Sequence, residues 1–398
     1  MSVGALAGTR VLEYGRLVAA PYAAKLLADM GAEVVKIEGP QGDPARRREP
    51  FPQDSPHPER SGLFLYVNTN KSGITLNLRT ATGQKVLAEL VKWADVLIED
   101  TPSRLTKELG LEYKKLKAVN PQIIVCSLTP FGRVGPYKDY KGYGLNVVHA
   151  GGEGYLLPGG VLDRPPVKGA GHLADYDAGV TAAIAIVAAL VWRDAGGPGQ
   201  HIDVSQQAAI MAQTRAALGR YTVDGVIDSR AGRTARVGTN LKASDGYYIL
   251  HAAMDHMWRA WVQVIGEPAW TRESRFQGDE ARQEHVNEAN ALIEEWSRSR
   301  PKKEVERIGQ AAHVPVGAAA TPADLLDNPQ EAYRGYFVEA AHPEAGVLKY
   351  PSAAYQLSRT PWKLERPAPL LGQHTEEVLG RLGYSQEDLV KMREAGVI

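Results

Sequence analysis

The side chains whose types and spacing best suit chemistry are two acids, Asp175 and Asp177, in the segment GHLADYDAG. They lie just before or at the start of an Ala-rich segment, residues 177–193, whose composition predicts a helix. Carboxylates are favoured at a helix start by the helix dipole and by backbone N–H groups that lack partners there. A cap on the helix accounts for one acid, but not for the small, Gly-rich chain leading up to it. We therefore take Asp175 as the candidate functional carboxylate.

The histidines and the cysteine are weaker candidates. The histidines are scattered without the spacing of metal ligands: His149, His172, His201, His251 and His256. The sequence contains neither the nucleophile-elbow pattern G-x-S-x-G nor a Walker A loop. The single cysteine, Cys126, lies inside the apolar run IIVCSL, which indicates a buried core residue rather than a catalytic thiol. We expect no metal site.

A cluster of positive charge lies in the segment GDPARRREP, residues 42–50, which has three adjacent arginines among Pro and Gly. Such a run is usually a solvated loop. Guanidinium groups also bind phosphates with two hydrogen bonds at once. The run is therefore a second candidate, for the phosphates of a large anionic cofactor.

The elements that would position these residues begin with a βαβ unit, residues 11–38. An apolar strand, a turn at Gly15, a helix from about Pro21, and a second strand ending in Glu38 are typical of a dinucleotide site. However, the turn lacks the pattern G-x-G-x-x-G, and side chains such as Leu17 would crowd a phosphate. The sequence predicts a Rossmann-like unit that does not bind NAD or FAD.

The same alternation continues along the chain. Strands are predicted at residues 73–78, 95–100, 123–128 and 201–207, and helices at 80–94 and 105–120. Strands alternating with helices favour a parallel sheet with right-handed crossovers. The fold class expected is α/β, with a Rossmann-like parallel-sheet large domain and a smaller α+β domain.

The domain boundaries follow from a change in composition after Tyr221. We predict a large domain formed by residues 1–221 together with 340–398, and a small α+β domain with linkers at 222–339. A strand at 247–252 and a helix at 282–300 belong to the small domain. The tail has good helix starts at Thr375 and Ser385, and is expected to return to the large domain.

Bulk composition excludes several classes of partner. The chain has 398 residues, with 46 Lys plus Arg and 46 Asp plus Glu, so no net charge attracts nucleic acid or an anionic membrane. One cysteine excludes an intrachain disulfide and fits a reducing compartment. The start of the sequence lacks a signal-peptide pattern, and the longest apolar stretch, 178–192, is too short to span a bilayer. We expect a cytoplasmic protein.

Several segments, in this order, together resemble the class III CoA-transferases, a family that includes the α-methylacyl-CoA racemases. The resemblance covers roughly residues 5–375. The segments are MGAEVVKIE followed by GDPAR, NKSGITLNLRTATGQ, ADVLIED, LKAVNPQIIVCSLTPFGRVGPY, and LADYDAG with GPGQHIDVS further on. The βαβ turn would then serve CoA rather than a dinucleotide.

The resemblance implies an interlocked homodimer, with acyl-CoA and a carboxylic acid as substrates and no tightly bound cofactor. The family's nucleophilic aspartate falls on Asp175. Its CoA-contacting segments fall on Val18-Ala19, on Leu76 to Arg79, on Asp100-Thr101 and on Lys141 to Gly144, which includes Tyr143. Backbone N–H groups of the Gly151–Gly152 turn are candidates to stabilise an oxyanion.

The sequence departs from the family pattern at some CoA contacts. Asp100-Thr101 stands where members often have Asn-Phe, and Glu108 stands where they have an arginine. Gly39 replaces a basic residue seen in formyl-CoA transferases. Other basic residues are therefore the candidates to bind the adenosine phosphates: Arg46, Arg47 and Arg79.

Two alternatives to a transferase remain open. The racemases of the family use a histidine in a Gly-His-Asp motif as an acid/base, and the matching place here reads Gly142-Tyr143-Gly144. Tyrosine is a poor acceptor for an α-proton, so the transferase is favoured. The other alternative is a non-catalytic CoA-binding subunit of a heteromeric transferase, against which an intact Asp175 argues. The family's Gly-rich active-site loop has no counterpart between Arg230 and Gly246, which disfavours oxalate or formate as the substrate.

Overall fold

The computed structural model describes residues 4–159, 163–231 and 236–398, and the chain divides into two compact units. The large unit comprises Met1–Tyr155, Val167–Ile227 and Tyr333–Ile398, and the small unit comprises Leu156–Pro166 and Asp228–Ala332. The domain boundaries inferred from the sequence, at 221/222 and 339/340, remain a prediction. Each unit is described by itself.

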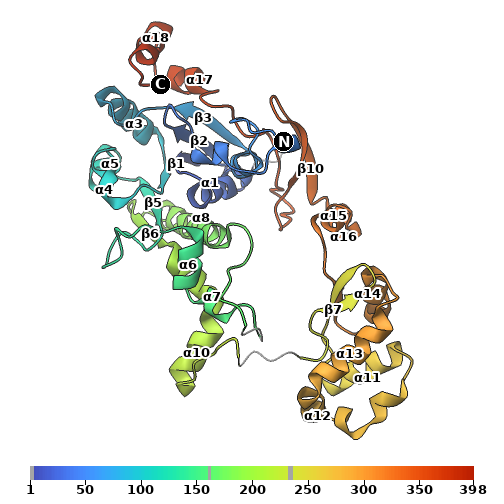
Figure 1. Cartoon of the computed structure of the whole chain (residues 1–398). Coiled ribbons are helices and arrows are strands. Elements are labelled where there is room, and N and C mark those ends of the chain that lie inside the picture. Colours follow the sequence, from blue (N-terminus) through green and yellow to red (C-terminus); the bar gives the residue numbers. More distant parts are fainter. Residues whose placement is uncertain (1–3, 160–162, 232–235) are drawn as a thin grey trace. The chain divides into compact units, whose positions relative to one another are not determined.

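The large unit is built on a six-stranded parallel sheet, as the alternation of elements predicted (Figure 1). Its strands lie in the order β3-β2-β1-β4-β5-β6. Their bounds are β1 (Arg10–Tyr14), β2 (Glu33–Glu38), β3 (Lys71–Thr75), β4 (Val96–Glu99), β5 (Ile124–Thr129) and β6 (His201–Ser205). Val11 of β1 pairs with Val34 on one side and with Val96 on the other. The strand order reverses between β1 and β4, and open α/β sheets bind ligands at the carboxyl ends of such neighbours.

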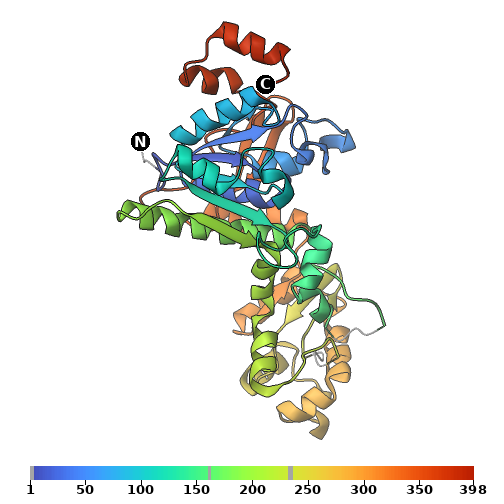
Figure 2. The same ribbon diagram turned by 90° about the vertical axis from the view of Figure 1, so that its left-hand side faces the viewer.

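Helices cover both faces of this sheet. On one face, α1 (Ala19–Asp29) and α8 (Leu173–Asp194) share a buried core with β1, β4 and β5 (Figure 2). The two helices cross closely, because a Cβ built on Gly179 would lie 3.0 Å from the carbonyl oxygen of Ala19. The other face packs against α3 (Ala81–Trp93) and α5 (Tyr113–Val119).

The apolar composition of α8 follows from this packing. By length and composition alone the helix could cross a membrane, with a mean hydropathy of 1.6 over its most apolar window. Its Ala178, Ala182 and Ile186 are fully buried against the sheet, which is the environment of a core helix.

One predicted helix, residues 105–120, is wrong in detail. The segment forms α4 (Ser103–Thr106), a turn, and then α5. Gly110 in the turn has a φ of +74°, a left-handed conformation that interrupts a right-handed helix and that glycine adopts without steric cost.

The end of the chain returns to the large unit. β10 (Phe337–His342) and β11 (Gly346–Pro351) pair as an antiparallel hairpin. α17 (Thr375–Arg381) and α18 (Gln386–Glu394) then pack into the core shared by α3 and β3 (Figure 1). Beyond β3, Asn77 donates its backbone N–H to Val397 O at 2.7 Å and its side-chain amide to Gly396 O at 3.1 Å. The last residues are thereby attached to the loop that follows β3.

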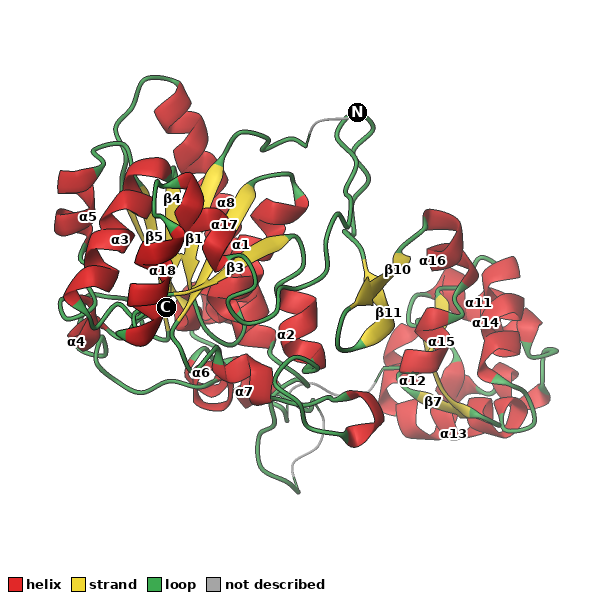
Figure 3. Ribbon diagram, turned by 90° about the horizontal axis from the view of Figure 1, so that it is seen from above, coloured by secondary structure: helices red, strands yellow, loops and turns green. Residues whose placement is uncertain are grey.

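The small unit holds a three-stranded antiparallel sheet, β7 (Leu241–Ala243), β8 (Gly246–Leu250) and β9 (Val316–Ala318), beside several helices (Figure 3). Trp258, Trp261 and Phe276 lie in its core. Its helices are α11 (Asp255–Val264), α12 (Asp279–Glu284), α13 (Val286–Ser297), α14 (Lys302–Ala311) and α15 (Pro322–Leu326). Further α-helices in the described residues are α2 (Gly62–Val67), α6 (Gly144–Ala150), α7 (Glu153–Leu156), α9 (Gln206–Met211), α10 (Arg215–Asp224) and α16 (Pro329–Arg334).

Candidate active site

Asp175 lies in the first turn of α8. It is the third residue of the helix, which His172 precedes as the N-cap. Its Oδ1 accepts a hydrogen bond from Gln206 Nε2 at 3.2 Å, and its Oδ2 lies 3.3 Å from His172 Nδ1. Gln206 opens α9 immediately after the edge strand β6. The Asp175 side chain keeps 19% of its surface exposed. The carboxylate is therefore oriented by neighbours, placed near the positive end of a helix dipole, and still accessible.

A second helix start faces this carboxylate. Gly144 is the first residue of α6, and a Cβ built on it would lie 3.7 Å from Asp175 Oδ2. The structure thus brings the predicted segment Lys141 to Gly144 to Asp175. First-turn N–H groups of a helix have no partner within that helix, so α6 presents donors on this side. Tyr143, just before α6, has 70% of its surface exposed.

Asp177 has a different environment from the one expected. It lies two residues deeper in α8, where its Oδ2 accepts a hydrogen bond from Gln213 Nε2 at 3.1 Å. It does not cap the helix, because the helix begins earlier, after His172. Burial, and then the charge of Asp177, raises the pKa of Glu153, so the carboxylates of Glu153 and Asp177 lie close to each other.

The Gly151–Gly152 turn does not supply an oxyanion site. Gly151 N donates to Val147 O at 2.8 Å, and Gly152 N donates to His149 O at 3.1 Å. A Cβ on Gly151 would approach Ile210 to 2.0 Å. These glycines close the end of α6 and allow it to pack on α9, so the expectation about their N–H groups is corrected.

A cluster of tyrosines lies beside Asp175. The rings of Tyr176 and Tyr22 meet edge to face at 4.7 Å, and Tyr66 contacts both. Burial raises the pKa of Tyr176 to about 12, with added contributions from Tyr22 and the Asp175 charge. These phenols stay neutral at physiological pH, so they form a wall of low polarity next to the carboxylate.

The β1–α1 turn adjoins the same region. Val18 and Ala19, the predicted CoA contacts, are buried at the start of α1, so only their backbone is positioned to meet a ligand. Because Ala19 packs on Gly179 of α8, the turn lies close to the helix that carries Asp175.

Asp100 and Thr101 follow β4 and lie next to this turn. Asp100 Oδ2 accepts a hydrogen bond from Arg16 N at 2.8 Å, and Asp100 Oδ1 lies 3.7 Å from Arg16 Nε. Burial raises the pKa of Asp100 to about 7, although Arg16 opposes the shift. Thr101 is buried, and its carbonyl accepts a hydrogen bond from Arg133 Nη2 at 2.9 Å. The two segments that β1 and β4 carry therefore meet where the strand order reverses.

The other predicted CoA contacts differ in how much of their surface is exposed. Leu76 is fully buried, whereas Arg79 is exposed and paired with Glu108. Arg79 also acts on Tyr14, whose pKa is raised chiefly by burial while Arg16 and Arg79 oppose the rise. The two arginines thus lie on the same edge of the sheet.

Arg46 is not presented to a ligand. Its guanidinium is buried, and it is bonded to Glu38 Oε1 at 2.7 Å and to Glu59 Oε2 at 2.5 Å. The carboxylates that hold it come from β2 and from the loop that follows Arg46, so a run of arginines in the sequence does not reveal them.

Cys126 does not contribute to the site. Burial raises the pKa of the Cys126 thiol, which is fully enclosed in the sheet. Within the described part of the chain, no group of three or more His, Cys, Asp or Glu side chains is placed to hold a metal ion.

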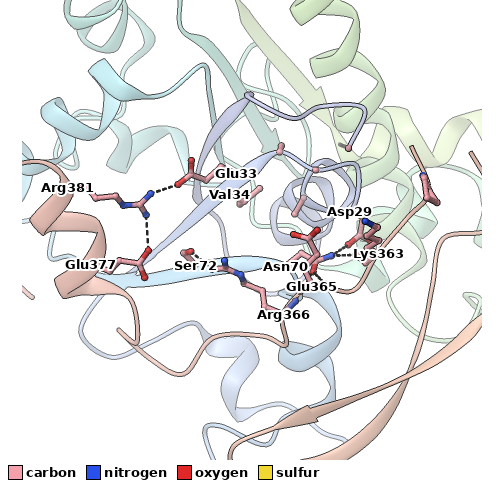
Figure 4. Close-up of a pocket in the computed structure, with 15 residues that line it drawn as sticks. Asp29, Glu33, Val34, Asn70, Ser72, Lys363, Glu365, Arg366, Glu377 and Arg381 are labelled. Carbon is pink, nitrogen blue, oxygen red and sulfur yellow. Dashed lines mark hydrogen bonds and ion pairs between the residues drawn. The ribbon is translucent and has the colours of Figure 1, made fainter. Parts of the chain in front are cut away.

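A separate cavity of about 280 Å³ lies around the amino ends of β2 and β3 (Figure 4). Two of its arginines have partners in the lining: Arg381 pairs with Glu33 at 2.7 Å, and Arg366 donates a hydrogen bond to the hydroxyl of Ser72 at 3.0 Å. Asp175 does not line it.

The family model described as CoA-transferase family III matches residues 6–375. The chain belongs to CoA-transferase family III. This family III transferase is 31% identical to a succinate–glutarate CoA-transferase of Agrobacterium fabrum, over 95% of each chain. It is 30% identical to a formyl-CoA:oxalate CoA-transferase of Rhodopseudomonas palustris, over 99% of this chain and 97% of the other.

The family III fold is also seen in a solved structure. A CAIB/BAIF family protein from Brucella suis superimposes with a TM-score of 0.87 at 29% identity, over 96% of this chain and 100% of the other. The protein is therefore an enzyme that acts on CoA thioesters, and the resemblance read from the sequence motifs is confirmed.

Sequence reasoning missed some neighbours of the nucleophile candidate. Gln206 and His172 contact Asp175. Gln206 was predicted to lie within the strand 201–207, whereas it directly follows β6, so its place near the carboxyl end of a strand was the available signal. The segment between Arg230 and Gly246, in which the family's Gly-rich active-site loop has no counterpart, includes residues 232–235. These four residues lie outside the described residues.

Proposed function

We propose that this family III transferase moves CoA from an acyl-CoA donor to a carboxylic acid acceptor, with Asp175 as the covalent nucleophile. The observation that carries the proposal is the placement of Asp175 at the start of α8, oriented by Gln206 and facing the first turn of α6. An ionised carboxylate with a wall of low polarity on one side is a competent nucleophile for a thioester.

The proposed reaction exchanges bonds at one carboxylate. Asp175 attacks the thioester carbonyl, the C–S bond breaks, and a mixed anhydride and CoA thiolate result. The thiolate attacks the Asp175 carbonyl of the anhydride, which releases the donor acid and leaves an aspartyl-CoA thioester. The acceptor carboxylate attacks this thioester to form a second anhydride and thiolate. The thiolate then attacks the acceptor carbonyl, and the Asp175 carboxylate is regenerated.

Backbone donors would stabilise the negative oxygen in these steps. We place the N–H groups of the first turn of α6 in this role, since Gly144 lies beside Asp175 Oδ2 and such donors are aimed at charge that develops in the transition state. The absence of a side chain on Gly144 leaves room for the acyl carbon.

The relatives suggest which substrates to test first. One relative is named for succinate and glutarate and another for formyl-CoA and oxalate. Because the sequence lacks a counterpart of the Gly-rich loop between Arg230 and Gly246, we favour succinyl-CoA as the donor and a dicarboxylic acid as the acceptor.

The assembly and location are also proposals. An exposed apolar stripe on α8, formed by Ile184, Val191 and Trp192 with 66%, 65% and 56% of their surfaces exposed, supports a homodimer. We propose that the dimer is interlocked and acts in the cytoplasm. The chain's one cysteine, buried and unpaired, fits a reducing compartment.

The test compares Asp175→Asn with Asp177→Asn. Asp175→Asn should lower kcat for transfer from succinyl-CoA to glutarate by several orders of magnitude while CoA still binds. Asp177→Asn loses only its interaction with Gln213 and should have a small effect. Hydroxylamine trapping after incubation with succinyl-CoA, read by peptide mass spectrometry, should label Asp175. A label on Asp177, or near-normal turnover by Asp175→Asn, would show that the assignment is wrong.

A further inference from the structure

The β1–α1 turn, residues 15–18, holds an unusual backbone conformation without a glycine at the critical position. Leu17 has a φ of +60°, in the left-handed region that costs roughly 1 kcal/mol or more for a residue with a Cβ. Such a conformation persists only where surrounding structure enforces it. The neighbours of Leu17 must therefore hold it.

A buried group of charges bonds directly to this turn. Asp43 Oδ1 accepts the Leu17 N–H at 2.9 Å, and Asp43 Oδ2 accepts from Lys36 Nζ at 2.9 Å. Lys36 Nζ also donates to Gly15 O at 3.0 Å and to Glu13 Oε1 at 2.7 Å. The side chains of Lys36, Asp43 and Glu13 are at most 1% exposed. Both peptide groups that flank Arg16 are thus tied to buried charges.

The same group fixes the beginning of α1. Lys71 Nζ donates to Glu13 Oε2 at 2.6 Å and to Pro21 O at 2.7 Å. Burial disfavours a charge on Lys36, but Glu13 and Asp43 outweigh it and raise its pKa above the usual value. Likewise, Lys36 and the backbone N–H groups lower the pKa of Asp43 against the effect of burial. The charges of Lys36 and Asp43 therefore persist at working pH, and removing one of these two partners would leave the other buried and unpaired.

The turn that these charges hold lies beside the reacting region. Arg16 N bonds to Asp100 where the strand order reverses, and Ala19 packs on Gly179 of the nucleophile helix. A shift of the turn would change the ligand-binding edge of the sheet. The charge group takes the place of the glycines that shape the same turn in dinucleotide-binding proteins.

We propose that Asp43, held by Lys36, is a positioning residue for acyl-CoA, because it fixes the left-handed Leu17 and so the shape of the β1–α1 turn. This inference rests on the proposed function. It also gives the GDPARRREP segment a role that does not require its arginines to bind phosphate: Asp43 shapes the turn, and Arg46 secures Glu38, which accepts the Asp43 N–H at 2.8 Å.

The first test compares Asp43→Asn with the matched control Asp29→Asn in the full-length protein. Asp29 is also a buried acid, paired with Lys25 at 2.5 Å, but it does not bond to the turn. Asp43→Asn should raise the Kd of CoA, measured by calorimetry, and the KM for acyl-CoA by about tenfold, the effect of about one lost charge-assisted hydrogen bond. The KM for the acceptor acid and kcat should change little. Asp29→Asn should lose thermal stability without this change.

A second pair of variants tests the turn without disturbing the buried charges. Leu17→Asn suits a left-handed residue, whereas Leu17→Val does not. Leu17→Val should weaken CoA binding more than Leu17→Asn, and Leu17→Asn should partly restore CoA binding to Asp43→Asn. Folded Asp43→Asn with wild-type CoA affinity, or equal affinities for the two Leu17 variants, would overturn the inference. Because calorimetry with CoA requires no transfer, this outcome is distinct from a failure of the Asp175 mechanism.

Discussion

Gly144 lies against the carboxylate of Asp175: a Cβ at position 144 would be in van der Waals contact with Asp175 Oδ2, at 3.7 Å. The two residues come from the starts of α6 and α8, which are separated in sequence but converge in the large unit. A methyl group at position 144 would still fit beside the Asp175 carboxylate. A larger side chain would occupy the space that we assign to the bound acyl carbon.

A side chain at position 144 should therefore obstruct the reaction. We expect Gly144→Val to lower kcat/KM for acyl-CoA by about tenfold or more, since a misplacement of about 1 Å at a reacting centre costs up to a hundredfold. Gly144→Ala should lose less. Steady-state kinetics checks this, with Gly380→Val as a control because a Cβ at Gly380 meets nothing within 4 Å. Wild-type kinetics for Gly144→Val would mean that the acyl group does not approach from this side.

Removing the Asp100 charge should stabilise the protein at alkaline pH. The folded-state pKa is about 7 against a reference of 3.8, so the folded protein binds more protons between these values, and stability falls as pH rises through that window. Asp100→Asn removes this cost. We expect a gain of about 1 kcal/mol at pH 8, less than the full shift implies because the asparagine amide bonds to Arg16 more weakly than the carboxylate does, and little change near pH 4.

Thermal unfolding by circular dichroism at both pH values measures this effect. Asp95→Asn is a suitable control, since Asp95 is comparably exposed at 17% but bonds to Arg10 and Arg193. That variant should lower Tm at pH 8. A lower Tm for Asp100→Asn at pH 8 would contradict the explanation by burial.

The enzyme should not exchange an α-proton. By the resemblance of the sequence to the family, Tyr143 falls where the racemases have a histidine. It is largely exposed, and its phenol is a poor base for a carbon acid. A 2-methylacyl-CoA incubated in deuterated buffer without an acceptor acid should keep its α-hydrogen, as followed by NMR. Rapid incorporation of deuterium would favour the racemase instead.

The protein should be a dimer that dilution does not separate. Light scattering should give twice the chain mass of 43.2 kDa even at nanomolar concentration. The double change Ile184→Arg with Trp192→Glu should shift the protein toward monomer or aggregate, because it places charges on the apolar stripe of α8. Val390→Arg, on α18, is the control for an exposed valine. A wild-type monomer would contradict the interlocked arrangement.

The sheet was predictable because its strands carry a local signal. Buried parallel strands such as those at Val96 and Ile124 read as continuous apolar runs, and helix starts such as Ser385 carry a capping pattern, which the structure confirms. The break at Gly110 was missed because helical periodicity persists on both sides of it. The hairpin of β10 and β11 was missed because its strands are partly exposed and carry no continuous apolar run.

A site residue could be predicted only where its role follows from a local feature of the sequence. Asp175 could be proposed because an acid at a helix start is a local feature, and the structure places it there. Arg46 was taken for a phosphate contact because its partners, Glu38 and Glu59, meet it only in the folded chain. Asp43 went unnoticed for the same reason, since nothing local links it to Leu17 and Lys36.

The bonds from Asn77 to the end of the chain impose an order on biosynthesis. Gly396, which accepts the Asn77 side-chain amide, follows it by 319 residues. At ordinary rates of translation, on the order of tens of seconds separate the two residues at the ribosome. The loop after β3, one of the predicted CoA contacts, therefore acquires these hydrogen bonds only after residues 396 and 397 have been made. A nascent chain can form much of its sheet earlier, but it should not bind CoA as the finished protein does.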